Sequence, residues 1–376
     1  MDKDVAVPNG ELACWLALHR APGIGPASFR ALLTRFGTPR AVLRAPPNTL
    51  AACGLPAPSR AYLAAPDWDA VERDLEWAQG ARRCVLTWDD PRYPPLLHQI
   101  SAPPPVLFVR GHPERLAGPQ LAVVGSRSPT PAGARTAEHF AQHLAQAGLS
   151  ITSGLALGID TAAHRGALAA GAPTIAVTGA GPDRVYPARN RRLAERIAEN
   201  GAVVSEFPVG TAPLPEHFPR RNRLISGLSL GTLVVEAAPR SGSLITARHA
   251  ADQGREVFAV PGSIHSPVAR GCHRLIREGA ALVETADDVL AELGPLAAAG
   301  HAAAVEAAPA SGALPEELDP RQRQVLEALG FEATPVDVVV LRTGLTAETV
   351  CSILLLLELQ GHAAACPGGG YARVPH

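Results

Sequence analysis

The chain has 376 residues, of which 47% are hydrophobic and 18% are charged, a composition typical of globular and not of disordered proteins. This length allows about two to four domains. No run of about 18 apolar residues occurs and no apolar segment follows the acidic start, so we expect neither a membrane span nor a secretory signal, and we expect a cytoplasmic protein. Six cysteines are scattered singly, as small hydrophobes in a reducing compartment are.

The net charge of −1 conceals an uneven distribution along the chain. Residues 184–277 carry 14 basic and 7 acidic side chains, whereas residues 278–376 carry 4 basic and 14 acidic ones. The basic centre indicates a surface for an anionic partner. All its basic residues are arginines, but Lys3 is the only lysine in the whole chain. The clustering of charge therefore indicates a phosphate-binding surface, whereas the use of arginine in place of lysine is no evidence for one.

Apolar periodicity predicts two helices near the N-terminus, Leu12–Leu18 and Ala27–Phe36. Between them, residues 21–26 read Ala-Pro-Gly-Ile-Gly-Pro, which gives the layout of a helix-hairpin-helix. The turn amides of that motif can meet a phosphate, but a simple tight turn explains the same glycines, and both interpretations stay open. We expect an N-terminal all-α module over residues 1–90 and a Pro-rich connector over residues 91–120.

Between residues 121 and 293, continuous apolar runs alternate with amphipathic helices such as Gly133–Ala147 and Arg191–Glu199. This alternation predicts an α/β domain with a Rossmann-like, doubly wound, mostly parallel sheet covered on both faces. Ligands of such sheets bind at the carboxyl ends of the strands. The predicted strands are Leu121–Val124, Leu149–Thr152, Thr174–Val177, Ala202–Val204, Thr232–Val235, Val257–Val260 and Ala281–Val283.

The C-terminal part of the chain predicts a linker over residues 294–317, rich in Ala, Pro, Gly and Ser, and a winged helix over residues 318–376. The winged helix is indicated by a hairpin through Gly368-Gly369-Gly370 and by the predicted helices Arg321–Leu329, Val336–Thr343 and Ala347–Leu359. The third helix contains glutamates but no Lys or Arg. Because phosphate repels such a helix, we expect it to serve protein contacts or regulation and not duplex recognition.

The first predicted strand runs into Gly125, Ser126 and Arg127 just before a helix. Glycine permits a tight turn, serine offers a hydroxyl and an amide, and arginine pairs with phosphate in a bidentate manner. These groups stand at a helix N-terminus, where the dipole favours an anion. The pattern is not G-x-G-x-x-G and lacks the acidic ribose-binding residue, so a dinucleotide site is not predicted.

The second predicted strand ends in a loop containing Ser153, Gly154 and Gly158, whose glycines let the backbone approach a ligand. The following helix carries Asp160 and His164, four residues apart on one face. They could form an acid–base dyad, but the interpretation we favour is that Asp160 caps the helix and orients His164.

Two strongly basic loops follow, residues 178–192 with four arginines and residues 218–223 with the sequence Phe-Pro-Arg-Arg-Asn-Arg. Cations for the backbone and a ring for stacking are the composition of sites for single-stranded nucleic acid. A solvated surface could carry the same charges, but both loops lie on the predicted ligand-binding edge. A Ser241-Gly242-Ser243 turn opens another helix, and Glu236 is expected to orient nearby arginines.

These loops yield one predicted site, with Phe218 as the base-stacking residue and with no catalytic residue, cofactor or metal. The predicted phosphate-binding residues are Gly125, Ser126, Arg127, Ser153, Gly154, Arg189, Asn190, Arg220, Arg221, Asn222, Arg223, Ser243, Thr246 and Arg248. We expect alanine substitution of Arg127 or Arg221 to weaken binding without sequence preference.

Taken together, these motifs resemble the DNA-processing protein A (DprA/Smf) family. The resemblance implies a non-enzymatic Rossmann-like domain that binds single-stranded DNA, forms a homodimer and loads the RecA recombinase during natural transformation. It also implies an N-terminal sterile-alpha-motif-like module and a C-terminal winged helix. Leu157 stands where the family often has arginine, which removes one phosphate contact. The resemblance rests on Val124-Gly125-Ser126-Arg127, Ser153-Gly154-Leu155-Ala156, Gly158-Ile159-Asp160, Tyr186-Pro187, residues 218–223, Ser241-Gly242-Ser243 and residues 255–262.

An alternative of another class is a lysine-decarboxylase-like enzyme that hydrolyses nucleoside monophosphates. Such enzymes carry Pro-Gly-Gly-x-Gly-Thr with a nearby catalytic glutamate. The equivalent stretch here is residues 226–232, with a partial set of glycines and with Glu236 displaced beyond it. Release of free base from a nucleotide would distinguish this alternative from a DNA-binding protein.

Overall fold

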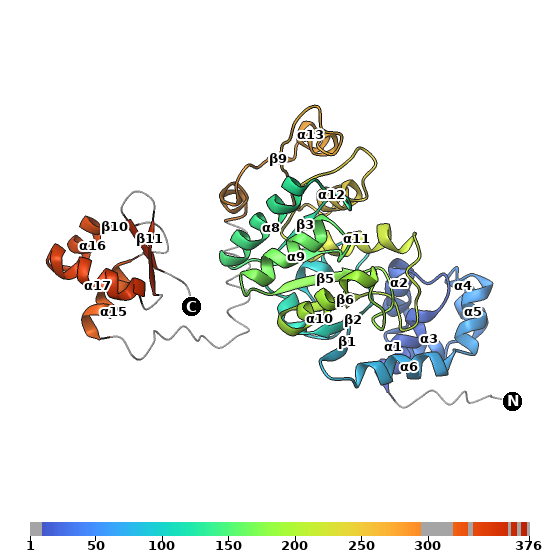
Figure 1. Cartoon of the computed structure of the whole chain (residues 1–376). Coiled ribbons are helices and arrows are strands. Elements are labelled where there is room, and N and C mark those ends of the chain that lie inside the picture. Colours follow the sequence, from blue (N-terminus) through green and yellow to red (C-terminus); the bar gives the residue numbers. More distant parts are fainter. Residues whose placement is uncertain (1–9, 295–318, 330–333, 360–361, 367–369, 374–376) are drawn as a thin grey trace. The chain divides into compact units, whose positions relative to one another are not determined.

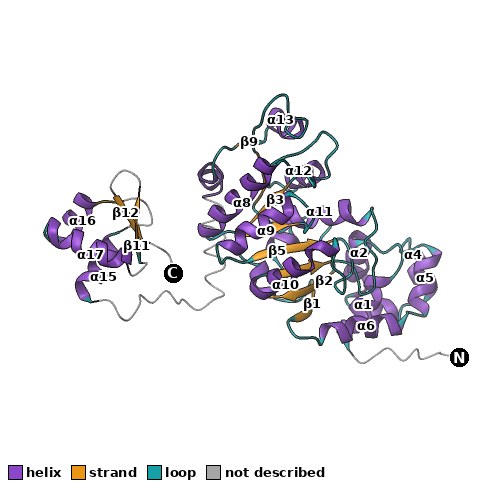
Figure 2. Ribbon diagram, viewed as in Figure 1, coloured by secondary structure: helices purple, strands orange, loops and turns teal. Residues whose placement is uncertain are grey.

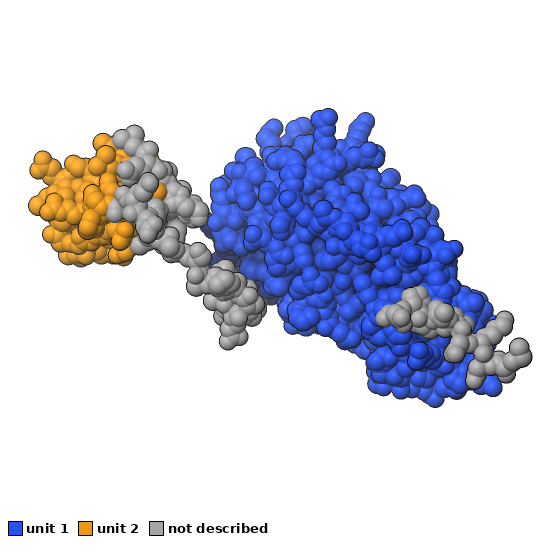
Figure 3. Space-filling view, turned by 90° about the horizontal axis from the view of Figure 1, so that it is seen from below, with its two compact units in different colours: residues 1–308 blue, residues 309–376 orange. Residues whose placement is uncertain are grey.

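The computed structural model describes residues 10–294, 319–329, 334–359, 362–366 and 370–373. The chain divides into two compact units, residues 1–308 and 309–376, coloured separately in Figure 3. The predicted linker lies outside the described residues except for Gly294, and so does the Gly368-Gly369 part of the predicted hairpin.

Six helices form the N-terminal module (Figure 1). The predicted first two helices are confirmed, since the break over residues 21–25 separates α1 from α2. Trp15 and Phe29 stack in the core of the module with ring centroids 5.3 Å apart. Side-chain caps start two of the helices, because Thr38 accepts from Ala41 N and Asp67 accepts from Ala70 N. The helices are α1 Glu11–Arg20, α2 Pro26–Phe36, α3 Pro39–Leu43, α4 Pro47–Ala52, α5 Ala57–Ala64 and α6 Trp68–Ala78.

A nine-stranded sheet with the order β1-β2-β6-β5-β4-β3-β7-β8-β9 forms the centre of the same unit. Its strands are orange in Figure 2. The strands from β6 to β9 pair in parallel, as the doubly wound prediction requires. All seven predicted strands are present. The strands are β1 Arg83–Thr87, β2 Val106–Gly111, β3 Gln120–Val124, β4 Ser150–Ser153, β5 Thr174–Thr178, β6 Ala202–Ser205, β7 Gly231–Val234, β8 Glu256–Ala259 and β9 Ala281–Leu282.

The Pro-rich connector predicted over residues 91–120 contains strand β2, which pairs antiparallel with β6 and with β1. The segment predicted as all-α over residues 1–90 ends in strand β1, so both strands extend the central sheet. Phe108 of β2 is fully buried among the N-terminal helices, whereas its neighbour Leu107 is buried on the other face. The sheet therefore continues directly into the core of the N-terminal module.

Helices cover both faces of the sheet. Alternate residues of β3 face opposite cores: Ala122 packs with α7, α11, α12 and α13, and Val123 packs with α8, α9 and the helical residues 286–294. The helices are α7 Pro95–His98, α8 Pro131–Gln146, α9 Ile159–Ala169, α10 Arg191–Asn200, α11 His217–Gly227, α12 Ser243–Asp252 and α13 Arg270–Arg277, with short 3-10 turns η1 Pro113–Leu116 and η2 Ala188–Asn190.

The C-terminal unit has the helices and strands of a winged helix. Asp319 and Gln322 form a capping box at the start of its first helix. Val325, Val339 and Leu354 are fully buried in its core. The predicted three helices are confirmed. The elements are α15 Pro320–Ala328, β10 Thr334–Pro335, α16 Val336–Thr343, α17 Ala347–Leu359, β11 Ala363–Cys366 and β12 Gly370–Arg373.

Among the described residues, no single helix has the length and apolar composition needed to cross a membrane. Within the described segments, α16 and α17 meet these two criteria only when they are taken together, as a pair bent by 110°.

Candidate nucleic-acid interface

A cleft of 680 Å³ lies at the carboxyl ends of the central strands, where ligands of doubly wound sheets bind. Its walls come from the loops after β3, β4, β5, β6 and β7 and from the helices α11 and α12. Eight of the predicted site residues line it: Gly125, Ser126, Arg127, Phe218, Arg221, Asn222, Ser243 and Thr246.

The loop that carries Arg127 is fixed by hydrogen bonds on both sides. Thr130 caps α8 by accepting from Gly133 N at 3.0 Å. On the other side, Ile159 N donates to Ser126 O at 3.1 Å. Gly158 permits this close approach, because a Cβ at its φ of +82° would collide with Ser126 O. The loops after β3 and β4 are therefore held together as one wall.

We predicted that Glu236 orients nearby arginines, and this assignment is corrected. Its carboxylate accepts from Thr130 N at 2.9 Å and from Thr130 Oγ1 at 2.7 Å. A carboxylate at the N-terminus of α8 also interacts favourably with the helix dipole. Glu236 thus anchors the loop that presents Arg127.

Arg221 forms the buried floor of the cleft, with only 3% of its surface exposed. Its Nη1 donates to Gly154 O at 2.7 Å and also to Val177 O, so one guanidinium joins the ends of β4 and β5. A Cβ on residue 154 would collide with this guanidinium, so the glycine is needed for the contact. Burial lowers the pKa of Arg221 to about 10, which leaves it charged at neutral pH.

Asp160 lies beside this guanidinium, and our assignment of it as a helix cap that orients His164 is corrected. Its Oδ2 accepts from Gly154 N at 3.1 Å and from Ala156 N at 3.2 Å, so it holds the preceding loop and not the first turn of α9. Burial raises the pKa of this carboxyl, and the Arg221 guanidinium opposes that effect.

His164 instead pairs with Thr174, at 2.7 Å between Nδ1 and Oγ1. Thr174 Oγ1 already donates to Ile151 O at 2.6 Å, so the imidazole must donate from Nδ1. Its Nε2 is buried without a partner among the described residues. A neutral ring satisfies this arrangement, and burial lowers the pKa of His164 to about 3.

Stability should therefore depend on pH through His164. Its folded pKa of about 3 lies below the ordinary value of about 6.5, so the unfolded chain binds the additional proton between these values. Its contribution to stability is complete above about pH 6.5 and is lost as the pH falls toward 3, by up to about 1.4 kcal/mol per pH unit. Urea unfolding of the wild type and of His164→Asn from pH 7 to pH 4 measures this, and the variant should show the shallower slope. Equal slopes would contradict it.

Arg127 is exposed at the mouth of the cleft and forms no ion pair within the described part of the chain. Its guanidinium carbon lies 5.6 Å from the ring centroid of Phe218, and Tyr186 lies 5.6 Å from the same ring. A free cation and two partly exposed rings at one edge can meet a phosphate and the face of a base.

The opposite wall is formed by α11 and α12. Asn222 Nδ2 donates to Gly242 O at 3.2 Å and ties the two helices together. Ser241 Oγ accepts from Ser243 N at 3.3 Å and contacts Ser243 Oγ at 2.7 Å. These hydroxyls lie at the first turn of α12, where the helix dipole favours an anion.

Several predicted phosphate contacts have structural partners instead, and these assignments are corrected. Ser153 is buried and donates to Val123 O at 2.6 Å. Asn190 is buried and donates to Leu155 O at 2.8 Å and Thr161 Oγ1 at 2.9 Å. Gly154 serves the contact with Arg221. These residues build the loops but do not face the cleft.

The remaining predicted arginines also lie outside the cleft lining. The predicted loop 218–223 is the start of α11, and Arg220 and Arg223 reach from it to the buried carboxylate of Glu206, at 3.3 Å and 2.5 Å. Arg189 is exposed on η2. Arg248 lines a different pocket, of 580 Å³, near α12 and α13. Arg220, Arg223, Arg189 and Arg248 therefore make no contact with the cleft.

Other residues line the cleft without having been predicted to do so. Arg240 adds an exposed cation, and Ile245 adds an apolar side chain that is 40% exposed. Tyr186, which was named in the family motif but not predicted as a site residue, also lines the cleft. Pro213 and Pro215 line it as well. Composition could have indicated Arg240, which directly precedes the predicted Ser-Gly-Ser turn, but no spacing distinguishes the prolines.

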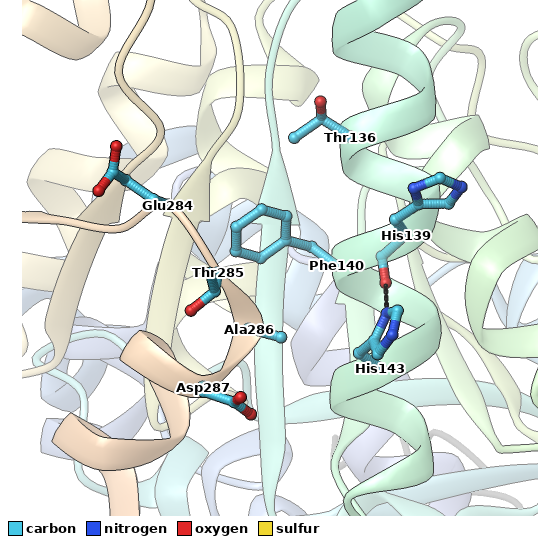
Figure 4. Close-up of a pocket in the computed structure, with 8 residues that line it drawn as sticks. All are labelled: Thr136, His139, Phe140, His143, Glu284, Thr285, Ala286 and Asp287. Atoms are coloured by element: carbon cyan, nitrogen blue, oxygen red, sulfur yellow. Dashed lines mark hydrogen bonds between the residues drawn. The ribbon is translucent and has the colours of Figure 1, made fainter. Parts of the chain in front are cut away.

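Figure 4 shows a smaller pocket of 410 Å³ between α8 and the segment after β9. Thr136, His139 and His143 project from the helix, opposite Glu284 and Asp287. His143 Nδ1 is already bonded to His139 O at 2.9 Å. Among the described residues, no group of three or more His, Cys, Asp or Glu side chains could hold a metal ion. This pocket shares no lining residue with the cleft.

Three family models match the chain. DNA recombination-mediator protein A matches residues 84–294, which is more than half of the sequence. A DprA-like N-terminal HHH domain matches residues 9–73, and a DprA winged helix domain matches residues 307–369. The chain belongs to the DprA/Smf family. The resemblance noted in the sequence is thereby confirmed.

Individual DprA/Smf relatives agree with this assignment. Protein Smf of Escherichia coli strain K12 is 45% identical over 308 residues, 81% of each chain. The X-ray structure of DprA from Streptococcus pneumoniae superposes with a TM-score of 0.67 at 38% identity, covering 74% of this chain and 97% of that one. DNA processing protein A from Helicobacter pylori, whose structure addresses its single-stranded DNA binding mode, gives a TM-score of 0.51 at 29% identity, covering 56% and 95%.

Proposed function

We propose that this DprA/Smf protein binds single-stranded DNA in the cleft at the carboxyl ends of the sheet. The observation that carries the proposal is the meeting of Arg127, Phe218 and Arg221 in one cleft. Arg127 would pair with phosphate, Phe218 would stack on a base, and Arg221 would supply positive potential from the floor. The Helicobacter pylori relative that is described for this binding mode supports the proposal.

Family membership extends the proposal to the cellular role. DprA relatives are DNA processing proteins by name, and the family that matches residues 84–294 is described as DNA recombination-mediator protein A. We therefore propose that the protein acts in natural transformation, without catalysing a reaction itself, by binding incoming single strands and loading the RecA recombinase on them. A homodimer belongs to the same proposal, and size-exclusion chromatography with light scattering tests it.

A salt titration tests the binding proposal directly. If about four or five phosphates are neutralised, log K should fall with log[salt] at a slope near −3, from roughly −0.7 per phosphate. Fluorescence anisotropy with labelled oligothymidylate measures this slope, and an affinity independent of salt would argue against phosphate binding. A duplex of the same length, which carries about twice as many phosphates, provides the comparison for strand preference: a single-strand binder should bind it more weakly despite its higher charge.

Phe218→Ala should weaken binding because it removes the stacking ring. Loss of one base–aromatic contact costs about 1–3 kcal/mol, which corresponds to roughly a 5- to 150-fold increase in Kd. Phe218→Trp keeps a ring and should bind nearly as well as the wild type. Anisotropy titrations at one salt concentration compare the three proteins. An alanine variant that binds like the wild type would remove Phe218 from the interface.

The nucleoside-monophosphate hydrolase is not favoured by the geometry. Residues 226–232 are buried at the end of α11 and the start of β7, on the opposite edge of the sheet from the cleft. Gly227 packs against Leu97 and Ile100, so it does not cradle a phosphate. Glu236 is bonded to Thr130 at the start of α8. We expect no release of free base from a panel of nucleoside monophosphates.

A further inference from the structure

The N-terminal module forms hydrogen bonds with residues 206–209, which follow β6, at two points. His19 of α1 donates from Nε2 to Glu206 O at 2.8 Å, and burial lowers its pKa to about 4, so it is neutral at physiological pH. Its neighbour Arg20 donates from Nη2 to Val209 O at 3.1 Å. Both ends of residues 206–209 are therefore held by adjacent residues of one helix.

Asp74 of α6 completes the second contact. Its carboxylate accepts from Arg20 Nε at 2.6 Å, from Arg20 Nη2 at 2.7 Å and from Val209 N at 2.9 Å. The pair thus satisfies both backbone groups of Val209, with side-chain exposures of 15% for Arg20 and 0% for Asp74. A buried bidentate pair has a narrowly defined geometry. We call this arrangement the Arg20–Asp74 clamp.

The clamped segment is coupled to the first turns of α11. The fully buried carboxylate of Glu206 pairs with Arg223 at 2.5 Å and with Arg220 at 3.3 Å. Phe207 stacks on His217 with ring centroids 4.3 Å apart, and the guanidinium of Arg220 lies 5.2 Å from the Phe207 ring. A shift of residues 206–209 would therefore move the start of α11.

Among the residues of that helix that line the cleft are Phe218 on its rim and Arg221 in its floor. Arg20 and Asp74 do not line the cleft. We propose that the N-terminal module controls DNA affinity without contacting the strand, because the Arg20–Asp74 clamp holds residues 206–209 and thereby positions α11. This inference rests on the proposed binding of single-stranded DNA, and it makes Arg20 and Asp74 positioning residues.

Asp74→Ala in the full chain tests the clamp. We expect an approximately tenfold weaker affinity for oligothymidylate, measured at a temperature where circular dichroism shows the variant folded. The effect should depend on Phe218, which directly follows His217 of the stacked pair, because Arg221 is held separately by the loop after β4 and by β5. In a Phe218→Ala background, Asp74→Ala should therefore add little, whereas in an Arg240→Ala background the two factors should multiply. A merely structural role of Asp74 would give the same factor in both backgrounds.

Leu50→Ala is the matched control. Leu50 is buried in the core of the N-terminal helices and makes none of the hydrogen bonds to residues 206–209. This variant should lose stability but keep its affinity within about twofold while folded.

The outcomes separate the two proposals. Wild-type affinity in Asp74→Ala, or equal factors in the two backgrounds, would overturn the positioning role while binding in the cleft stands. A wild-type protein that fails to bind oligothymidylate would refute the proposed function itself, before any variant is compared.

Discussion

Arg221→Ala should destabilise the protein more than any other substitution in the cleft, lowering the free energy of unfolding by about 2–4 kcal/mol. The guanidinium is the donor for Gly154 O and Val177 O, and its loss leaves both buried carbonyls without that partner. Asp160 also loses the cation that opposes its burial. Urea unfolding followed by circular dichroism measures the change.

Two further variants identify the cause. Arg221→Lys keeps a charge but cannot reproduce the fork of donors, so it should recover only part of the stability. Arg220→Ala is the matched neighbour on the same helix, half exposed and 3.3 Å from Glu206, and should cost less than about 1 kcal/mol. Equal losses for Arg220→Ala and Arg221→Ala would show that the buried guanidinium has no special role.

The central sheet could be predicted because each parallel strand is a continuous apolar run between amphipathic helices. β2 has the same character, since Val106, Leu107, Phe108 and Val109 are all fully buried. It was missed because it lies among prolines, which indicate a connector. Its partner β6 is distant in the sequence, and no local pattern shows that an antiparallel pair will extend a parallel sheet.

The edge of the sheet where the site lies was predictable, but the roles of its arginines were not. Residues 218–223 belong to α11, so a helical spacing governs them. Arg220 and Arg223 are three residues apart and share one face, on which both reach Glu206. Arg221 projects about 100° away from Arg220 and enters the floor. Only the helical register separates the arginine of the cleft from the two that hold Glu206.

Arg127→Ala should weaken binding of single-stranded DNA about tenfold or more, with little change in stability. The side chain is exposed and its main partner within the protein is the Phe218 ring, so its loss leaves no buried group unsatisfied. A charge-assisted contact to phosphate is worth about 1.5–3 kcal/mol, and tenfold in Kd corresponds to about 1.4 kcal/mol. Anisotropy titrations with single-stranded oligonucleotides of one length and several sequences measure the effect. It should be the same for each sequence because phosphate carries no base information.

The salt dependence shows whether the lost contact was ionic. Removing one phosphate contact should make the slope of log K against log[salt] shallower by about 0.7. Arg115→Ala is the charge-matched control, because Arg115 is exposed on η1, ahead of the amino end of β3 and so on the opposite edge of the sheet. It should leave both affinity and slope unchanged. If Arg115→Ala and Arg127→Ala reduced the affinity equally, DNA binding would depend on the net charge of the protein. That result would contradict binding of single-stranded DNA in the cleft.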